Sequence, residues 1–85
     1  MTKNPTENPR YIFDPQKLTA LRKGAGLSMA QVGAKLRVLG VGKLSAARQQ
    51  VWNWENGGYS PQSKMLRGLA DVFGVSMETF FKRPE

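Results

Sequence analysis

The 85-residue sequence predicts an all-α protein made of five short helices. Apolar residues recur at the three- and four-residue spacing that places them on one face of a helix. Helix-start residues precede these segments and glycines follow them, which sets the expected boundaries. The short length and an apolar content of 40% allow one small domain with a single modest core.

The first helix is expected to begin at Asp14-Pro15, because an N-cap residue followed by proline is a strong start signal. Phe13 precedes this cap and stands where it can pack against Leu18 as a hydrophobic staple. The helix is expected to end at Gly24 and Gly26.

The second helix is expected to run from Ser28 to about Leu36. Ser28 and Gln31 have the spacing of a capping box, in which each side chain accepts a hydrogen bond from the backbone of the other residue. Gly33 is unfavourable in the middle of a helix, so it predicts that another helix approaches closely there.

The third helix is expected to open after a cap at Ser45 and to end at Asn56-Gly57-Gly58. Its apolar stripe is Ala47, Val51 and Trp54. The other side carries Arg48, Gln49, Trp52, Asn53 and Asn56. Planar amide and guanidinium groups match base edges in the DNA major groove, so this side predicts a helix that reads DNA. An ordinary amphipathic helix is the alternative, although solvated faces are mostly glutamate and lysine.

Ser60-Pro61 repeats the cap and proline signal for a fourth helix that ends at Gly74. The core positions of this helix are Leu66, Leu69, Ala70 and Phe73. Ser76 is expected to cap a short fifth helix with apolar residues Met77, Phe80 and Phe81. The helical domain therefore spans residues 14–81, between an N-terminal arm (1–13) and a C-terminal tail (82–85).

The composition excludes several classes of chemistry. The chain has no cysteine and no histidine, and its six acidic residues are scattered, so we expect neither an enzyme nor a metal or other cofactor. We expect no membrane association and a cytoplasmic location, since no apolar run reaches the ~18 residues of a membrane span and no secretory signal is visible.

The formal net charge of +7 is distributed unevenly along the chain. Between Pro15 and Trp54 there is no aspartate or glutamate. The cations of this stretch are Lys17, Arg22, Lys23, Lys35, Arg37, Lys43 and Arg48. A basic half of this kind is typical of proteins that bind a phosphate backbone.

The chain resembles the λ-repressor-like helix-turn-helix family (Cro/C1, or XRE type) over roughly three quarters of its length. The matching residues are Leu18-x-x-Leu21-Arg22, Gly26-Leu27-Ser28, Val32, Leu36, Arg48-Gln49-x-Val51-x-x-Trp54-Glu55-Asn56-Gly57, Pro61, Leu66-x-x-Leu69-Ala70 and Phe73-Gly74-Val75-Ser76. The resemblance implies a five-helix DNA-binding domain, and a repressor of transcription that binds an inverted-repeat operator as a homodimer. In size and style the chain is also similar to small plasmid-borne repressors.

The sequence departs from the family pattern in two places. Met29 occupies the position after Ser28 where the family usually has a glutamine that holds a phosphate. The connection between the second and third helices, residues 37–44, is about eight residues longer than family spacing, against the usual 3–4-residue turn. One expectation is that this connection extends the second helix and packs on the core. The other is that it lies along the DNA backbone, with Arg37 and Lys43 as the contacts. The two are compatible, because its apolar residues can pack while its cations bind phosphate.

The expected DNA contacts fall into two sets. The residues expected to read bases are Arg48, Gln49, Gln50 and Asn53. The residues expected to bind phosphate are Ser28, Lys35, Arg37, Lys43, Asn56 and Tyr59. For Trp52 we favour packing beneath the long connection over contact with thymine methyl groups or sugar.

Two structural contacts are also expected. The family pattern implies an ion pair between Arg22 and Glu55 that joins the first and third helices. A homodimer interface is expected at the short fifth helix, through Met77, Phe80 and Phe81, whose apolar surface exceeds what so short a helix needs. The arm around Tyr11 and Ile12 is the alternative interface, unless it packs on its own domain.

Two other functions remain open. An antitoxin of a toxin–antitoxin pair has the same kind of domain, although we expect no long tail to wrap a toxin. A protein-binding or single-strand RNA-binding module normally shows exposed aromatic residues, whereas most aromatic residues here fall on core positions. No small-molecule ligand is expected.

Overall fold

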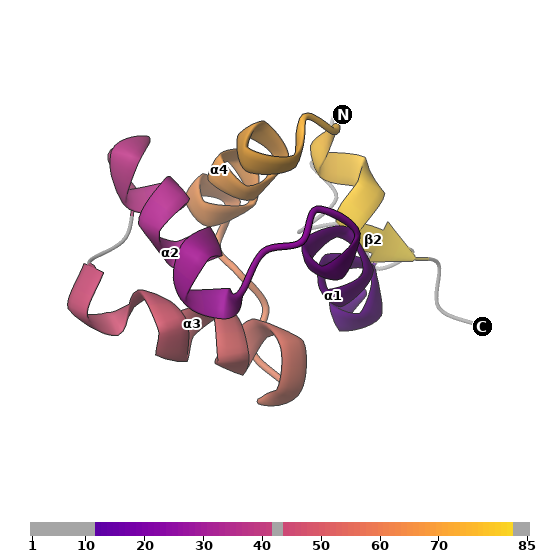
Figure 1. Ribbon diagram of the computed structural model, residues 1–85. Coiled ribbons are helices and arrows are strands. Elements are labelled where there is room, and N and C mark those ends of the chain that lie inside the picture. Colours follow the sequence, from indigo (N-terminus) through magenta and orange to yellow (C-terminus); the bar gives the residue numbers. More distant parts are fainter. Residues whose placement is uncertain (1–11, 42–43, 83–85) are drawn as a thin grey trace.

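A computed structural model describes residues 12–41 and 44–82, except for the side chains of residues 44–46. It contains the α-helices α1 (Pro15–Gly24), α2 (Met29–Val38), α3 (Leu44–Asn56) and α4 (Ser63–Phe73). A short 3-10 helix, η1 (Met77–Phe80), and the two-residue strands β1 (Ile12–Phe13) and β2 (Phe81–Lys82) complete the fold (Figure 1). The protein is mostly helical, as predicted, but the expected fifth helix is a single 3-10 turn followed by a strand.

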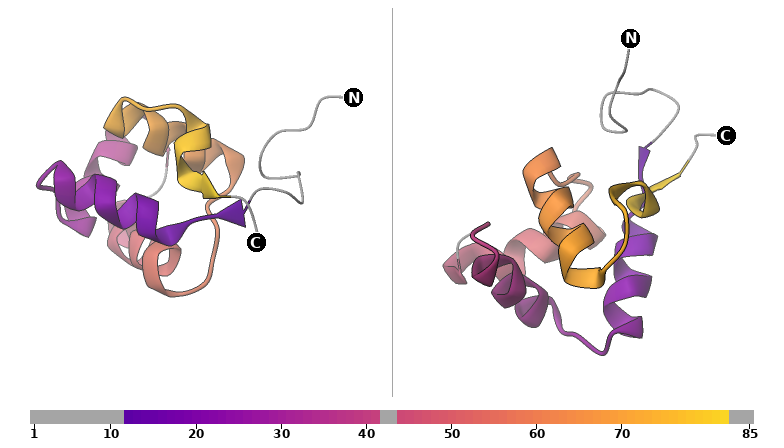
Figure 2. Two further views of the ribbon diagram at one scale, coloured as in Figure 1. Left: turned by 90° about the vertical axis from the view of Figure 1, so that its right-hand side faces the viewer. Right: turned by 90° about the horizontal axis from the view of Figure 1, so that it is seen from above.

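The two ends of the described chain lie side by side (Figure 2). β1 pairs with β2 in antiparallel register, so that Phe13 lies opposite Phe81. Their rings meet edge to face with centroids 6.4 Å apart. The Asp14 side chain caps α1 by accepting a hydrogen bond from the Gln16 amide at 3.0 Å, as predicted. Phe13 therefore packs on its own chain and is not part of a free arm.

α2 crosses α3 in close contact (Figure 1). The capping box is present at the start of α2: the Gln31 amide donates to Ser28 Oγ at 3.1 Å, and the Ser28 amide donates to Gln31 Oε1 at 2.7 Å. A methyl group at Gly33 would overlap the Ala47 side chain of α3. The close approach predicted from Gly33 is therefore confirmed, and the helix that approaches is α3.

The connection after α2 begins later than expected, because α2 continues to Val38. The Val41 amide then donates to the Leu36 carbonyl oxygen at 2.9 Å, which turns the chain back. Val41 packs against the core beside Gly68 of α4. The described part of the connection thus extends the second helix and returns to the core, while residues 42 and 43 lie outside the described ranges.

Two predicted helix starts are wrong. α3 begins at Leu44, so Ser45 lies inside its first turn, and its side chain is not among those described. α4 begins at Ser63 with Gln62 at the cap position, and the Leu66 amide donates to the Gln62 carbonyl oxygen at 2.9 Å. Pro61 is buried before the helix instead of opening it. α4 ends before Gly74, which adopts the left-handed conformation (φ 66°) that glycine accepts without strain.

The core lies where the four helices and η1 meet. Its fully buried side chains are Phe80, Leu18, Leu36, Leu66, Leu69, Val32 and Val51. Phe81 is also buried and Met77 is half-buried against the core. The apolar residues of the last segment are therefore covered by their own chain, and the expectation that they present a surface to a second copy is wrong for Phe80 and Phe81.

In the part of the chain that the structure describes, no helix combines the length and the apolar character needed to span a membrane.

Candidate nucleic-acid interface

The solvent side of α3 is a polar surface on a helix whose other side is held in the core. Ala47, Val51 and Trp54 are buried, as the sequence predicts. We define the outer face of α3 as Arg48, Gln49, Trp52, Asn53 and Asn56. All five side chains reach solvent, and only Asn53 is half-buried. Because the buried stripe fixes the rotation of α3 about its axis, it also fixes the direction in which the outer face points.

Two of the side-chain amides on this face, those of Gln49 and Asn53, are joined by a hydrogen bond. Gln49 Nε2 donates to Asn53 Oδ1 at 3.0 Å, one helical turn along α3. Within the described residues, no other hydrogen bond engages Gln49 Oε1, the second Gln49 N–H or the Asn53 amide protons. An acceptor and several donors are therefore held at one place on the helix.

Gln50 differs from its neighbours. It is half-buried and lines a shallow hollow between α3 and the start of α4, with Trp54, Ser60, Gln62 and Met65. Its side chain therefore lies at the flank of the outer face, turned toward the connection to α4.

Trp52 is 47% exposed, whereas Trp54, two residues later, is 6% exposed. The apolar residues described in the connection do not account for the expected packing: Val41 lies against the core, and Val38 and Leu39 are themselves exposed. The described part of the connection therefore does not provide the predicted packing for Trp52, while residues 42–43 and the side chains of residues 44–46 lie outside the described ranges. A large apolar ring remains on the outer face.

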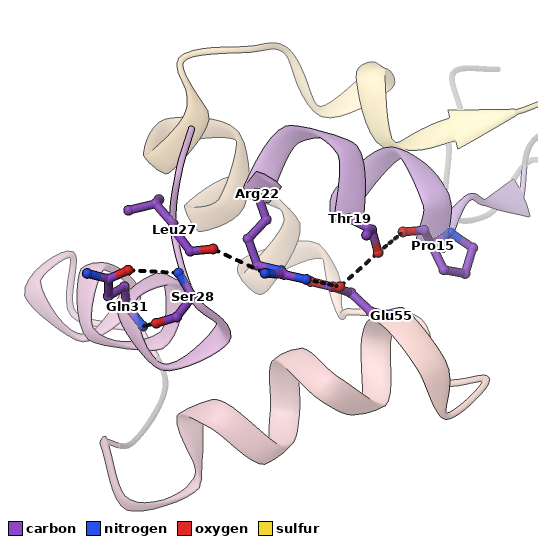
Figure 3. A network of polar contacts seen from close by, with 7 residues as sticks. All are labelled: Pro15, Thr19, Arg22, Leu27, Ser28, Gln31 and Glu55. Atoms are coloured by element: carbon purple, nitrogen blue, oxygen red, sulfur yellow. Dashed lines mark hydrogen bonds and ion pairs between the residues drawn. The ribbon is translucent and has the colours of Figure 1, made fainter. Parts of the chain in front are cut away.

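A network of polar side chains ties α3 to α1 (Figure 3). Arg22 Nε donates to Glu55 Oε2 at 2.7 Å, and a terminal nitrogen of Arg22 donates to Glu55 Oε1 at 3.0 Å. The other terminal nitrogen donates to the Leu27 carbonyl oxygen at 3.1 Å, just before α2. The predicted ion pair is therefore present, and it also reaches the entry to α2.

The ion pair is largely shielded from water, with side-chain exposures of 12% for Arg22 and 2% for Glu55. The hydrogen bonds to the Glu55 carboxylate raise the pKa of Arg22, and its charge adds to this, while desolvation acts in the opposite direction. Arg22 therefore remains charged at neutral pH.

Thr19 is a member of the network that the sequence analysis missed. Its hydroxyl lies 2.8 Å from Glu55 Oε1 and 3.1 Å from the Pro15 carbonyl oxygen (Figure 3). The one available signal was spacing, because Thr19 precedes Arg22 by three residues and so shares its face of α1.

The start of α2 presents backbone N–H groups to solvent. The capping box uses the amides of Ser28 and Gln31. Helix geometry leaves the amides of Met29 and Ala30 without an intrahelical acceptor, and the Ser28 hydroxyl keeps its own proton to donate. The Met29 side chain packs against the core, so it does not replace the family's glutamine as a polar contact.

The end of α3 is a tight turn. The amides of Gly57 and Tyr59 both donate to the Asn53 carbonyl oxygen, at 2.9 and 3.4 Å. Tyr59 is 65% exposed, and Asn56, the last residue of α3, is also exposed. The turn therefore brings the backbone of Tyr59 close to Asn53, at the end of the outer face that carries Asn56.

The three cations expected near the connection do not share one location. Arg37 is exposed and follows Gly33 by one turn, so it lies on the side of α2 that meets α3. Lys35 lies on the other side of α2, in a groove that it lines with Asp71 and Val72 of α4. Lys43 is outside the described residues. Lys35 is therefore not placed with the expected phosphate contacts.

The chain matches no model of a protein family, and no curated protein and no solved structure is significantly similar to it. What the outer face of α3 binds therefore has to follow from the residues on it.

Proposed function

We propose that the protein is a sequence-specific double-stranded-DNA-binding regulator of transcription, most simply a repressor, and not an enzyme. In this proposal α2 and α3 form the helix-turn-helix of a λ-repressor-like (Cro/C1, XRE-type) domain. The observation that carries the proposal is the outer face of α3, where guanidinium and amide groups gather on a helix fixed by its buried side. A merely solvated helix face has no need of this composition, and a helix of this kind fits the major groove.

In the proposed complex α3 lies in the major groove. The Arg48 guanidinium suits the two acceptors of guanine, and the amides of Gln49 and Asn53 suit adenine. Gln50 contributes at the flank, since its side chain is turned toward α4. The ion pair between Arg22 and Glu55 holds α3 at a set angle to α1, which such reading requires.

Phosphate contacts would surround this helix. The first amides of α2 and the Ser28 hydroxyl offer donors on one side, and Asn56 and Tyr59 offer donors on the other. Arg37 and Lys43 add charge, and the net charge of +7 favours approach to any nucleic acid. Lys35 is left out of this set, because it lies beside Asp71 on the far side of α2.

We further propose that the protein binds as a homodimer on an inverted repeat, because one α3 covers too few bases to select one site in a genome. Two copies would place their α3 helices about 34 Å apart. Phe80 and Phe81 are buried, so they cannot form the expected interface. The alternative interface is the N-terminal arm, in which Ile12 is exposed, while Tyr11 lies outside the described residues. Sedimentation of the protein alone and on its operator tests the dimer. One chain saturating the whole operator would contradict it.

Selection of duplexes from a random pool by the purified protein tests the function. We expect an inverted repeat to emerge, and its binding to survive excess random duplex but to be lost when the sequence is scrambled. Equal affinity for the selected and scrambled duplexes would reject sequence-specific recognition.

Two exposed aromatic side chains favour a second candidate function, the binding of single-stranded nucleic acid. Trp52 and Tyr59 are 47% and 65% exposed, and aromatic rings of this kind stack on unpaired bases. The same purified protein distinguishes the candidates. Tighter binding to a single strand than to the duplex of the same sequence would favour the second.

A further inference from the structure

Trp52 is the one apolar side chain on the outer face of α3. It follows Arg48 by one turn and precedes Asn56 by one turn, so it lies in line with two groups of the proposed DNA contact. About half of its surface, 47%, is exposed to solvent. Trp54 already supplies the buried tryptophan of this helix.

We propose that Trp52 is a specificity-determining residue that contacts the 5-methyl group of thymine in the major groove. This proposal rests on the proposed function. The thymine methyl is the apolar group that the base edges of the major groove present, and it is recognised by apolar contact instead of hydrogen bonds. Arg48, Gln49 and Asn53 offer hydrogen bonds to guanine and adenine, so a face that reads thymine directly needs an apolar member. Trp52 supplies it.

The arrangement on α3 supports this chemistry. The hydrogen bond from Gln49 to Asn53 lies on the opposite edge of the outer face from Glu55, and Trp52 stands between that edge and the ion pair. An indole at this position reaches out from the helix where a base edge would lie. Packing the indole of Trp52 against a thymine methyl group would remove apolar surface of both groups from water.

The test replaces each thymine of the selected operator with deoxyuridine, which deletes only the 5-methyl group. We expect one or two positions in each half-site at which affinity falls about fourfold, the factor that corresponds to removing one methyl group from an apolar contact. The Trp52→Ala variant should bind more weakly and should no longer distinguish thymine from deoxyuridine at those positions. Trp52→Phe should keep part of the discrimination, because it keeps a ring.

Tyr59→Ala is the matched control, since it removes another exposed aromatic side chain from outside α3. As a proposed phosphate contact, Tyr59 should affect binding to the thymine and deoxyuridine duplexes equally, so this variant should bind both more weakly and keep the same sensitivity to deoxyuridine. The melting temperature of each variant checks the fold. If Trp52→Ala melts much lower than the parent, Trp52→Gln takes its place in the same comparison.

Several outcomes would overturn the proposal. The deoxyuridine penalty persisting in the Trp52 variants would assign methyl recognition to another residue. Loss of affinity in the variants with no sensitivity to deoxyuridine at any position would indicate contact with sugar or phosphate. Both results leave the proposed function intact, because an operator is still selected. Failure to select any duplex would reject the proposed function itself.

Discussion

At the scale of single residues, the side chains on the outer face of α3 differ in whether a hydrogen bond ties them to a neighbouring side chain. Arg48 is exposed, and no shared hydrogen bond within the described residues ties it to the amides beside it. Gln49 and Asn53 are joined, so a change in one alters the orientation of the other. The two kinds of residue should therefore respond differently to substitution.

Arg48→Ala should weaken operator binding by about 1–3 kcal/mol for each half-site and relax the base preference at one position in each half-site. The reason is loss of a bidentate contact to one base, which a smaller side chain cannot replace. Binding constants for the operator and for random duplex check this. An equal loss on both duplexes would mean that Arg48 contacts only the phosphate backbone.

Gln49→Ala and Asn53→Ala should be non-additive in their effect on operator affinity. Each single variant removes a base contact and also releases its partner, so the double variant should cost about 0.5–1.5 kcal/mol less than the sum of the singles. Arg48→Ala combined with Asn53→Ala is the control pair and should be additive, because the two residues are five apart on α3 and no hydrogen bond within the described residues joins them. Additive losses for Gln49 and Asn53 would contradict their action as a unit.

At the scale of helices, the position of α3 depends on one polar network and one steric contact. Arg22 and Glu55 link α3 to α1, while Gly33 lets α2 cross α3 at Ala47. Both contacts join residues far apart in the chain, so each affects the stability of the whole domain.

Arg22→Met should destabilise the protein by about 3 kcal/mol, since it leaves the Glu55 carboxylate desolvated and without its charged partner. The double variant Arg22→Met with Glu55→Leu should be more stable than the single one. Urea unfolding of the three proteins measures this, with Thr19→Val as the control that removes only a hydroxyl and should cost about 1 kcal/mol. A double variant less stable than Arg22→Met alone would contradict the pairing.

Gly33→Ala should destabilise the protein by about 1–3 kcal/mol, because the new methyl group overlaps Ala47 and forces α2 and α3 apart. Gly24→Ala is the matched control: an added methyl there meets nothing within 4 Å and should be neutral or slightly stabilising. Thermal unfolding measures both. Adding Ala47→Gly to Gly33→Ala should recover part of the loss, and the absence of any recovery would show that the overlap is not the cause.

At the scale of the whole molecule, the feature that matters most for the proposed function is the uneven distribution of charge. The net charge of +7 comes mainly from the stretch between Pro15 and Trp54, which carries no acidic residue. The same stretch contains α1, α2 and most of α3. The excess of positive charge therefore lies in the half of the chain that carries most of the proposed DNA contacts.

Operator affinity should fall steeply with salt. For about six to ten phosphates neutralised by a dimer, the logarithm of the binding constant should fall against the logarithm of salt concentration with a slope of about −5 to −9. Lys35→Ala should leave this slope unchanged, because Lys35 lies beside Asp71 on the far side of α2. Arg37→Ala should reduce the slope by about two units, because the dimer loses one phosphate contact from each subunit. Affinity that hardly varies with salt would rule out a phosphate-binding surface.

The sequence by itself determined the features that depend on near neighbours in the chain. The cap at Asp14, the capping box of Ser28 and Gln31, and the end of α4 at Gly74 all follow from contacts within a few residues. The buried stripe of α3 was also predictable, because helical periodicity alone separates it from the outer face. The sequence is therefore enough to identify which side chains of α3 lie on its outer face, although not what surrounds them.

Only the tertiary structure decided what distant segments do to one another. Pro61 is buried and does not open α4, and Phe81 pairs with Phe13 in a strand instead of extending a helix. Likewise, Lys35 faces α4 and Trp52 remains exposed. These outcomes depend on which helix lies across from each residue. Local propensities are too weak, at a few tenths of a kcal/mol per residue, to oppose the burial of a large apolar side chain worth about 1.5–3 kcal/mol.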